Sequence, residues 1–121
     1  MFICLSPGGQ SLTTGETATE KLLVGTVNGI FSFVKQRGKW NRQETMLSDQ
    51  HISAIIFEPS SRTLLAGSYN GAIFASSDNG NNWQQRNQGI VDKEIYSLAS
   101  QLVGGRPRVY AGTQPAHLYY S

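Results

Sequence analysis

The sequence predicts an all-β fold made of repeated antiparallel units, and three observations lead to this expectation. Short apolar segments that end in Gly-Thr or Gly-Ser recur along the chain, and they are residues 22–26, 64–68 and 109–113. Their glycines, Gly25, Gly67 and Gly112, are spaced by 42 and 45 residues, which is the length of a four-stranded repeat. The composition agrees, because Gly accounts for 13 of 121 residues and charged residues for only 15%.

The second repeat, about residues 50–88, is the complete one. We expect its four strands at residues 52–57, 63–68, 72–76 and 82–87. Asn70-Gly71 separates the second strand from the third and is typical of a tight hairpin turn, since both residues tolerate positive φ. Apolar character falls from the first strand to the fourth, which is polar apart from Trp83. The first strand is therefore expected to be buried and the fourth to form an outer edge.

The first repeat, about residues 1–45, is a variant of this unit. It begins inside its first strand, at residues 2–5, and residues 7–20 are rich in Gly, Thr and Ser, so we expect a long loop there. Trp40 aligns with Trp83, and we expect it still to pack, but Lys35 stands where Asp78 does and Phe33 where Ser76 does, so this turn must be held differently.

The third repeat, about residues 94–121, has three strands. Gln114-Pro115 replaces the Asn-Gly of the second repeat, so its hairpin turn must be different. Ser121 aligns with Ser76 of the second repeat. We expect the 121 residues to form one segment of a longer protein; the alternative is a fragment whose copies assemble with one another.

The stretch from residue 76 to residue 83 reads Ser-x-Asp-x-Gly-x-x-Trp. Asp and Asn side chains bond their own backbone two residues on, and Gly accepts positive φ, so we expect a tight turn with the tryptophan folded back onto the sheet. This pattern resembles the Asp-box of the sialidase-type (BNR) β-propellers, and the matching residues are Ser76, Asp78, Gly80 and Trp83. The resemblance implies a partial β-propeller of antiparallel four-stranded blades, in which the box is structural.

The resemblance also implies where a ligand would bind. In such propellers the loops between the second and third strands, and those that lead into the first strand, form the binding face. The candidate residues on that face are Asn28, His51, Tyr69, Asn70, Glu94 and Gln114. We therefore expect a non-catalytic binding or assembly scaffold that recognises a protein or a glycan. The alternative for each residue is structural, with the Asn residues as turn formers and His51 and Glu94 as solvated loop residues.

A second functional hypothesis is a fragment of an Asp-box glycoside hydrolase, sialidase-like or xyloglucanase-like. Such an enzyme needs a carboxylate pair, or an arginine cluster with a tyrosine nucleophile and a glutamate, on the binding face. The six arginines of the chain fall mostly in turns and strands away from that face. We therefore predict no catalytic residue in this segment, and no cofactor. Asp78 and the neighbouring Asn side chains offer oxygens, but one carboxylate makes a weak calcium site, so no metal is predicted either.

The net charge and the apolar content of the chain exclude further classes of partner. The net charge of +2 comes from scattered residues, so no nucleic-acid partner is expected. No apolar run approaches the roughly 20 residues of a membrane helix, and residues 1–5 are too few for a signal peptide. Cys4 is the single cysteine, which rules out an internal disulfide bond. The residues themselves do not identify the cellular compartment, whereas the resemblance implies a secreted or periplasmic protein.

Overall fold

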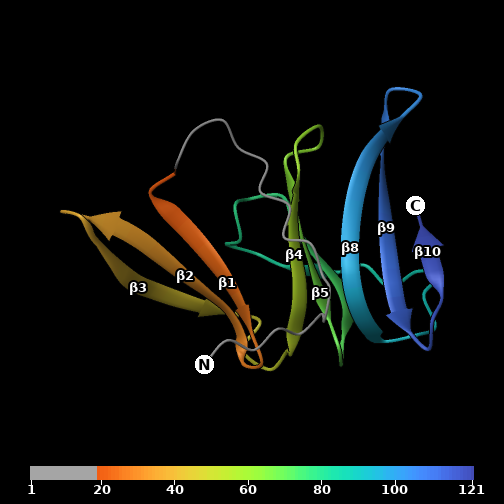
Figure 1. Ribbon diagram of the computed structural model, residues 1–121, viewed down its shortest axis with the longest axis horizontal. Helices are drawn as coiled ribbons and strands as arrows, with labels where there is room; N and C mark the ends of the chain where they lie inside the picture. Colours follow the sequence, from red (N-terminus) through yellow and green to blue (C-terminus); the bar gives the residue numbers. More distant parts are fainter. Residues whose placement is uncertain (1–18) are drawn as a thin grey trace.

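A computed structural model of the chain describes residues 19–121. The expected strand at residues 2–5, most of the loop at 7–20 and Cys4 lie outside this range. Residues 19–121 form ten strands and no helix, and the strands pair in three antiparallel sheets that stand side by side (Figure 1). The prediction of an all-β, antiparallel fold is therefore confirmed. None of the described segments could cross a membrane as an apolar helix.

The first sheet has the order β1-β2-β3, with β1 at Lys21–Thr26, β2 at Gly29–Gln36 and β3 at Lys39–Met46. Two short hairpin turns join its strands. The second of them, Arg37-Gly38, has positive φ at both positions, at 50° and 76°. This is the backbone that a tight hairpin requires, and it lets β3 continue directly from β2.

The second sheet has the order β4-β5-β6-β7, with β4 at Ile52–Glu58, β5 at Thr63–Ser68, β6 at Ala72–Ser76 and β7 at Gln84–Gln85. The strands predicted at 63–68 and 72–76 are confirmed. The strand predicted at 82–87 is wrong in length. The amide of Ile73 donates to the side chain of Asn87, at 3.1 Å, in place of a backbone acceptor, so the regular ladder ends at Gln85.

The third sheet has the order β8-β9-β10, with β8 at Glu94–Val103, β9 at Arg106–Gln114 and β10 at Leu118–Tyr120. The turn between β9 and β10 contains a cis peptide bond between Gln114 and Pro115. The hydroxyl of Thr113 donates to the carbonyl of Pro115 at 2.7 Å and closes this turn. The prediction that this turn differs from the Asn-Gly turns is confirmed.

The second sheet packs against its two neighbours through the same kind of contact on each side. A side-chain carbon built on Gly25 would lie 2.8 Å from Cγ2 of Ile52, and one built on Gly67 would lie 2.6 Å from Cγ2 of Ile95. Each isoleucine therefore occupies the space that only a glycine on the adjacent sheet leaves free. Both isoleucines are buried, at 1% and 0% exposure.

Two hydrophobic clusters result, one on each face of the second sheet. Side chains alternate along a strand, so Ala66 belongs to the cluster with the first sheet and Leu65 to the cluster with the third. Ser53 adds a polar link, because its hydroxyl lies within hydrogen-bond distance of the carbonyl oxygens of Gly67 and Ile95. The core thus consists of two layers between three sheets.

The prediction that Trp40 still packs is wrong, whereas the prediction that its turn is held differently is confirmed by the tight hairpin at Arg37-Gly38. Trp40 is 46% exposed, and the ammonium of Lys35 lies 5.9 Å from the centre of its ring. Trp83 is half-buried and packs against the cluster between the first and second sheets. The difference comes from the preceding turn. Trp40 stands in the continuous strand β3, whereas Trp83 follows a long turn that folds its ring back onto the sheet.

Candidate functional site

The turns β1–β2, β5–β6 and β9–β10 and the first residues of β4 and β8 lie along one edge of the molecule, at the bottom of Figure 1. We call this edge the turn edge. It follows from the strand directions, because in antiparallel sheets every second connection returns to the same end. The residues predicted as a ligand face are carried by these turns and strand starts.

Asn70 holds the centre of the turn edge together. Its side-chain oxygen Oδ1 accepts hydrogen bonds from the hydroxyl of Ser68, at 2.7 Å, and from the backbone amide of His51, at 3.0 Å. Its side-chain NH₂ donates to the carbonyl of Asp49 at 3.1 Å. Asn70 therefore fixes the loop before β4 to the β5–β6 turn. These bonds support the structural interpretation of Asn70 and position the side chains beside it.

Three aromatic rings form a row next to Asn70. His51 and Tyr69 have ring centres 4.6 Å apart, and Tyr69 and Tyr96 have ring centres 4.9 Å apart with perpendicular planes. Edge-to-face contacts of this kind stabilise aromatic pairs. The row joins the second sheet to the third, and Tyr96 at its end is 43% exposed. His51, Tyr69 and Tyr96 are called the aromatic row below.

Tyr96 was not among the residues predicted for a ligand face. Glu94 is among them, but the simple alternation along a strand does not extend from Glu94 to Tyr96, because Tyr96 is the extra residue of a bulge between Ile95 and Ser97. The same irregularity occurs between Ile52 and Ala54, where Ser53 takes the position that Tyr96 has in the third sheet.

The phenol of Tyr69 is held in its neutral form. Burial raises the pKa of Tyr69 above its usual 10, and the neighbouring Tyr96 and the charge of Glu94 act in the same direction. A neutral phenol donates and accepts hydrogen bonds.

His51 contributes the one unsatisfied buried side-chain atom found among residues 19–121. Its Nε2 atom is shielded from solvent and has no hydrogen-bond partner there. Buried polar atoms are normally paired, because a buried group without a partner loses its bond to water. Nε2 therefore lies unpaired within the aromatic row and is not exposed on its surface.

The remaining predicted residues lie along the same edge. Glu94 is placed opposite Gln114 in the register of β8 and β9, and both are exposed. Asn28 lies in the β1–β2 turn, where its amide donates to the hydroxyl of Thr26 at 3.1 Å. The structure thus groups His51, Tyr69, Asn70 and Glu94 around the aromatic row. Gln114 is beside Glu94, and Asn28 belongs to the turn of the first sheet.

The turn at residues 76–83 is tied by its own side chains. The hydroxyl of Ser76 donates to a carboxylate oxygen of Asp78, at 2.8 Å, and accepts from the amide of Gly80 at 2.9 Å. Asp78 also accepts from the amide and the side chain of Asn82, at 2.9 and 2.7 Å. The Nε1–H group of Trp83 donates to the carbonyl of Gly80 at 3.0 Å. Every named contact lies inside the turn, which is the arrangement of a structural element.

A second carboxylate, Glu58, closes the β4–β5 hairpin. It is 3% exposed and accepts hydrogen bonds from the amides of Ser60 and Ser61 and from the hydroxyl of Ser61. These donors stabilise the charged form. The hydroxyl and amide of Ser61 lower the pKa of Glu58 to about 2, and the bonds from Asn82 and Ser76 lower the pKa of Asp78 to about 2.

These two carboxylates predict an acid-sensitive fold. Because their pKa values are lower in the folded chain than in the unfolded chain, the unfolded chain binds more protons, and the free energy of unfolding falls as the pH falls. The stabilisation should be complete above about pH 5 and be lost progressively toward pH 2. Urea unfolding at a series of pH values measures it. Glu58→Gln and Asp78→Asn should each flatten the dependence, and Asp49→Asn, at an exposed position, is the control; equal slopes in all four proteins would contradict it.

One further group of polar side chains joins β10 to the loop before β8. A carboxylate oxygen of Asp92 lies 2.7 Å from Nδ1 of His117 and accepts a hydrogen bond from the hydroxyl of Tyr119 at 2.7 Å. These bonds lower the pKa of Asp92, and the bond to Asp92 raises the pKa of Tyr119. These contacts fix β10 against the loop before β8, and within residues 19–121 no three His, Cys, Asp or Glu residues converge as metal ligands.

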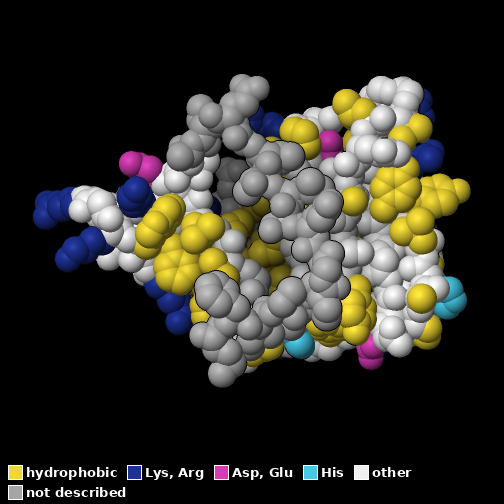
Figure 2. All heavy atoms as spheres, in the orientation of Figure 1, with side chains coloured by type: hydrophobic (Ala, Val, Ile, Leu, Met, Phe, Trp, Pro, Cys, Tyr) yellow, Lys and Arg dark blue, Asp and Glu magenta, His cyan; other side chains and the backbone are white. Residues whose placement is uncertain are grey.

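The surface away from the turn edge is uneven. Figure 2 shows Lys and Arg side chains together at the far left, over the β2–β3 hairpin, where Lys35, Arg37 and Lys39 lie. Hydrophobic side chains gather at the right, over the third sheet, whose exposed residues include Leu118 and Tyr120, each at 68%. Positive charge is therefore concentrated at the β2–β3 hairpin, where the cations lie within residues 35–39.

No family model and no curated protein matches this chain.

Proposed function

We propose that this chain is part of an Asp-box β-propeller and acts as a non-catalytic scaffold that binds a protein or a glycan at the turn edge. The observation that carries the proposal is the aromatic row. It offers an exposed ring at Tyr96 and, in edge-to-face contact with it, the ring and hydroxyl of Tyr69 within one short stretch of the turn edge. Flat apolar faces beside a few fixed polar groups are the usual elements of a recognition site.

The repeated geometry supports the propeller part of the proposal. Three antiparallel sheets follow one another along the chain, and the glycine–isoleucine contact recurs between consecutive sheets. The turn at residues 76–83 has the residue pattern of an Asp-box and the internal hydrogen bonds that such a turn needs. The side chains of Ser76 and Asp78 already form their hydrogen bonds within the turn. We therefore place the ligand at the turn edge and not at this turn.

A glycoside hydrolase is less well supported by the same residues. Tyr69 and Glu94 are near each other, as a tyrosine nucleophile and its partner would be, but the raised pKa of Tyr69 opposes nucleophilic attack. Glu94 stands opposite Gln114 and not opposite a second carboxylate. The register of β8 and β9 therefore does not itself bring two carboxylates together at Glu94, as the pair of acids of most glycosidases would be.

The proposal is tested by titrating the chain with panels of oligosaccharides and peptides, sialosides and xyloglucan fragments included, and following backbone amide signals by NMR. A ligand of the turn edge should shift the signals of residues 51, 69 and 96. Tyr96→Ala should weaken its binding about tenfold or more, because exposed aromatic rings dominate such contacts. Tyr120→Ala, an exposed tyrosine of the same sheet, should leave the affinity unchanged.

Two results would contradict the proposal. Binding that is equally weakened by Tyr120→Ala and Tyr96→Ala would mean that the turn edge is not the contact surface. Hydrolysis of an aryl glycoside or a sialoside that is abolished by Glu94→Gln would show an enzyme and not a scaffold.

A further inference from the structure

The rings of Tyr69 and Tyr96 meet at a right angle at the turn edge, with their centres 4.9 Å apart. Tyr96 is 43% exposed, so part of its ring is open to a partner. The face of an aromatic ring carries partial negative charge and attracts cations. The aromatic row therefore offers a surface against which a positively charged group can lie.

Contacts between cations and aromatic rings recur on the surface of this chain. Three pairs are formed within it, and measured to the ring centre they are Phe31 with Arg42 at 3.8 Å, Trp40 with Lys35 at 5.9 Å and Tyr120 with Arg108 at 5.0 Å. Tyr96 has no such contact with a residue of the described range 19–121. A cation for this ring would therefore come from a partner.

A negative charge lies close to the aromatic row. Glu94 precedes Tyr96 by two residues at the start of β8 and is exposed. At the lower edge of Figure 2, which is the turn edge, an acidic side chain lies near hydrophobic ones. Burial is the main cause of the raised pKa of Tyr69, and the charge of Glu94 adds to it. A charge that disfavours a phenolate at this place favours a cation there.

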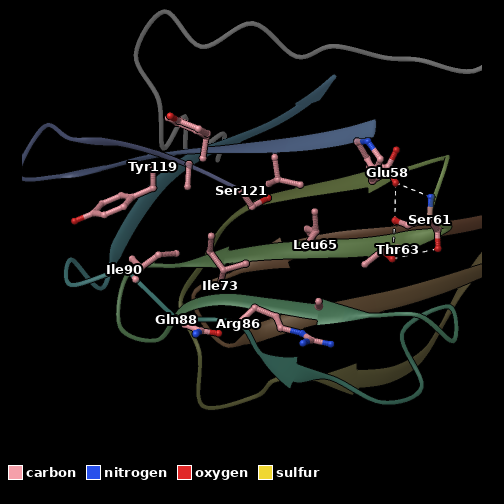
Figure 3. Close-up of a pocket in the computed structure, with 16 residues that line it drawn as sticks. Glu58, Ser61, Thr63, Leu65, Ile73, Arg86, Gln88, Ile90, Tyr119 and Ser121 are labelled. Atoms are coloured by element: carbon pink, nitrogen blue, oxygen red, sulfur yellow. Dashed lines mark hydrogen bonds between the residues drawn. The ribbon is translucent and has the colours of Figure 1, made fainter. Parts of the chain in front are cut away.

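The carboxylate of Glu94 differs from its neighbours in having no partner inside the described chain. Figure 3 shows the carboxylate of Glu58 joined to Ser61 by hydrogen bonds, beside a pocket between the second and third sheets. Asp92 likewise has donors of its own. No residue of 19–121, Lys93 included, forms an ion pair with Glu94. An exposed ring beside an unpaired carboxylate suits an arginine or a lysine, because the ring attracts the cation and the carboxylate balances its charge.

We propose that Tyr69, Tyr96 and Glu94 form a binding site for a cationic side chain, an arginine or a lysine, of a partner protein. The inference rests on the proposed function of the turn edge and narrows its ligand to a basic segment of a protein. The cation lies against the ring of Tyr96, and Glu94 neutralises its charge. The three residues come from β8 and the β5–β6 turn, so the site is formed within the second and third sheets.

The test compares two peptide probes that differ in charge, acetyl-glycyl-arginyl-glycinamide and the same peptide with neutral citrulline in place of arginine. Titration of the 121-residue chain, followed by amide NMR, should give saturable shifts at residues 69, 94 and 96 with the arginine probe. The citrulline probe should bind at least about fivefold more weakly, because it lacks the attraction to the ring face and to the carboxylate. Added salt should weaken binding of the arginine probe, since it screens exposed charges.

Two variants with matched controls test the residues. Glu94→Gln should weaken binding of the arginine probe about threefold or more and reduce its salt dependence. Glu44→Gln, at an exposed glutamate of β3, should leave the affinity unchanged. Tyr96→Ala should also weaken binding about threefold or more. Phe57→Ala should not, although Phe57 is 52% exposed, because it lies near the other end of β4. Circular dichroism checks the fold of these variants, all of which are changed at exposed positions.

The inference is overturned if the arginine probe gives no saturable shift at these residues, if the citrulline probe binds equally well, or if Glu94→Gln keeps full affinity. A neutral glycan that binds at the turn edge and needs Tyr96 but not Glu94 would overturn this inference alone and leave the proposed function standing. Glycoside hydrolysis that is lost in Glu94→Gln would contradict the proposed function, whatever the arginine probe does.

Discussion

Replacing Ile95 by alanine is expected to lower the free energy of unfolding by about 2–5 kcal/mol, the range for a large-to-small change in a core. Ile95 is 0% exposed, and its Cγ2 methyl group fills the space above Gly67. The change removes buried apolar area and leaves a cavity between the second and third sheets. The atoms that line this cavity lose their van der Waals contacts. Urea unfolding followed by circular dichroism measures the loss.

Val91→Ala is the control for this prediction, because Val91 precedes the same strand and is 81% exposed. Its free energy of unfolding should stay within about 0.5 kcal/mol of the unchanged chain. If Ile95→Ala were equally harmless, the contact between the second and third sheets would contribute nothing to stability, and the packing described above would be wrong.

Trp83→Ala is expected to lower the free energy of unfolding by about 3 kcal/mol, the low end of the range for tryptophan because the ring is only half-buried. The change also removes the hydrogen bond from Nε1 to the carbonyl of Gly80. Trp40→Ala is a matched control within the same chain. Since Trp40 is 46% exposed and stands in a regular strand, its removal should cost well under half as much.

The same urea titrations compare the two tryptophan variants. Equal decreases in the free energy of unfolding would mean that the two rings are equivalent, as their alignment in the sequence indicates. They would contradict the packing of Trp83 into the cluster between the first and second sheets. Added indole should restore part of the stability of Trp83→Ala, because it can occupy the space that the side chain leaves.

Local residue patterns are sufficient to predict the first three strands of the second sheet. Residues 63–68 and 72–76 carry the apolar pattern, and Asn70-Gly71 marks the turn between them, so each boundary had its own signal. The fourth strand had no such signal. Its shortening depends on the side chain of Asn87, which takes a hydrogen bond from another strand.

The candidate site was predictable only in part. The resemblance to sialidase-type propellers implies that His51, Tyr69 and Glu94 share one edge, and the directions of the strands place them there. It did not predict the aromatic row, since the contact between Tyr69 and Tyr96 joins two sheets. The alignment also equated Trp40 with Trp83, because it compares positions and not the lengths of the preceding turns.

The glycine–isoleucine contacts have a consequence for how a disturbance spreads through the molecule. Each contact joins one sheet to the next in the chain, through Gly25 with Ile52 and through Gly67 with Ile95. The sheets then behave as members of a row in which each one is coupled to its immediate neighbour, as in proteins built from stacked repeats. By these contacts, a change in the first sheet reaches the third only through the middle one. The middle sheet is the transmitter between two surfaces that differ in charge and apolarity.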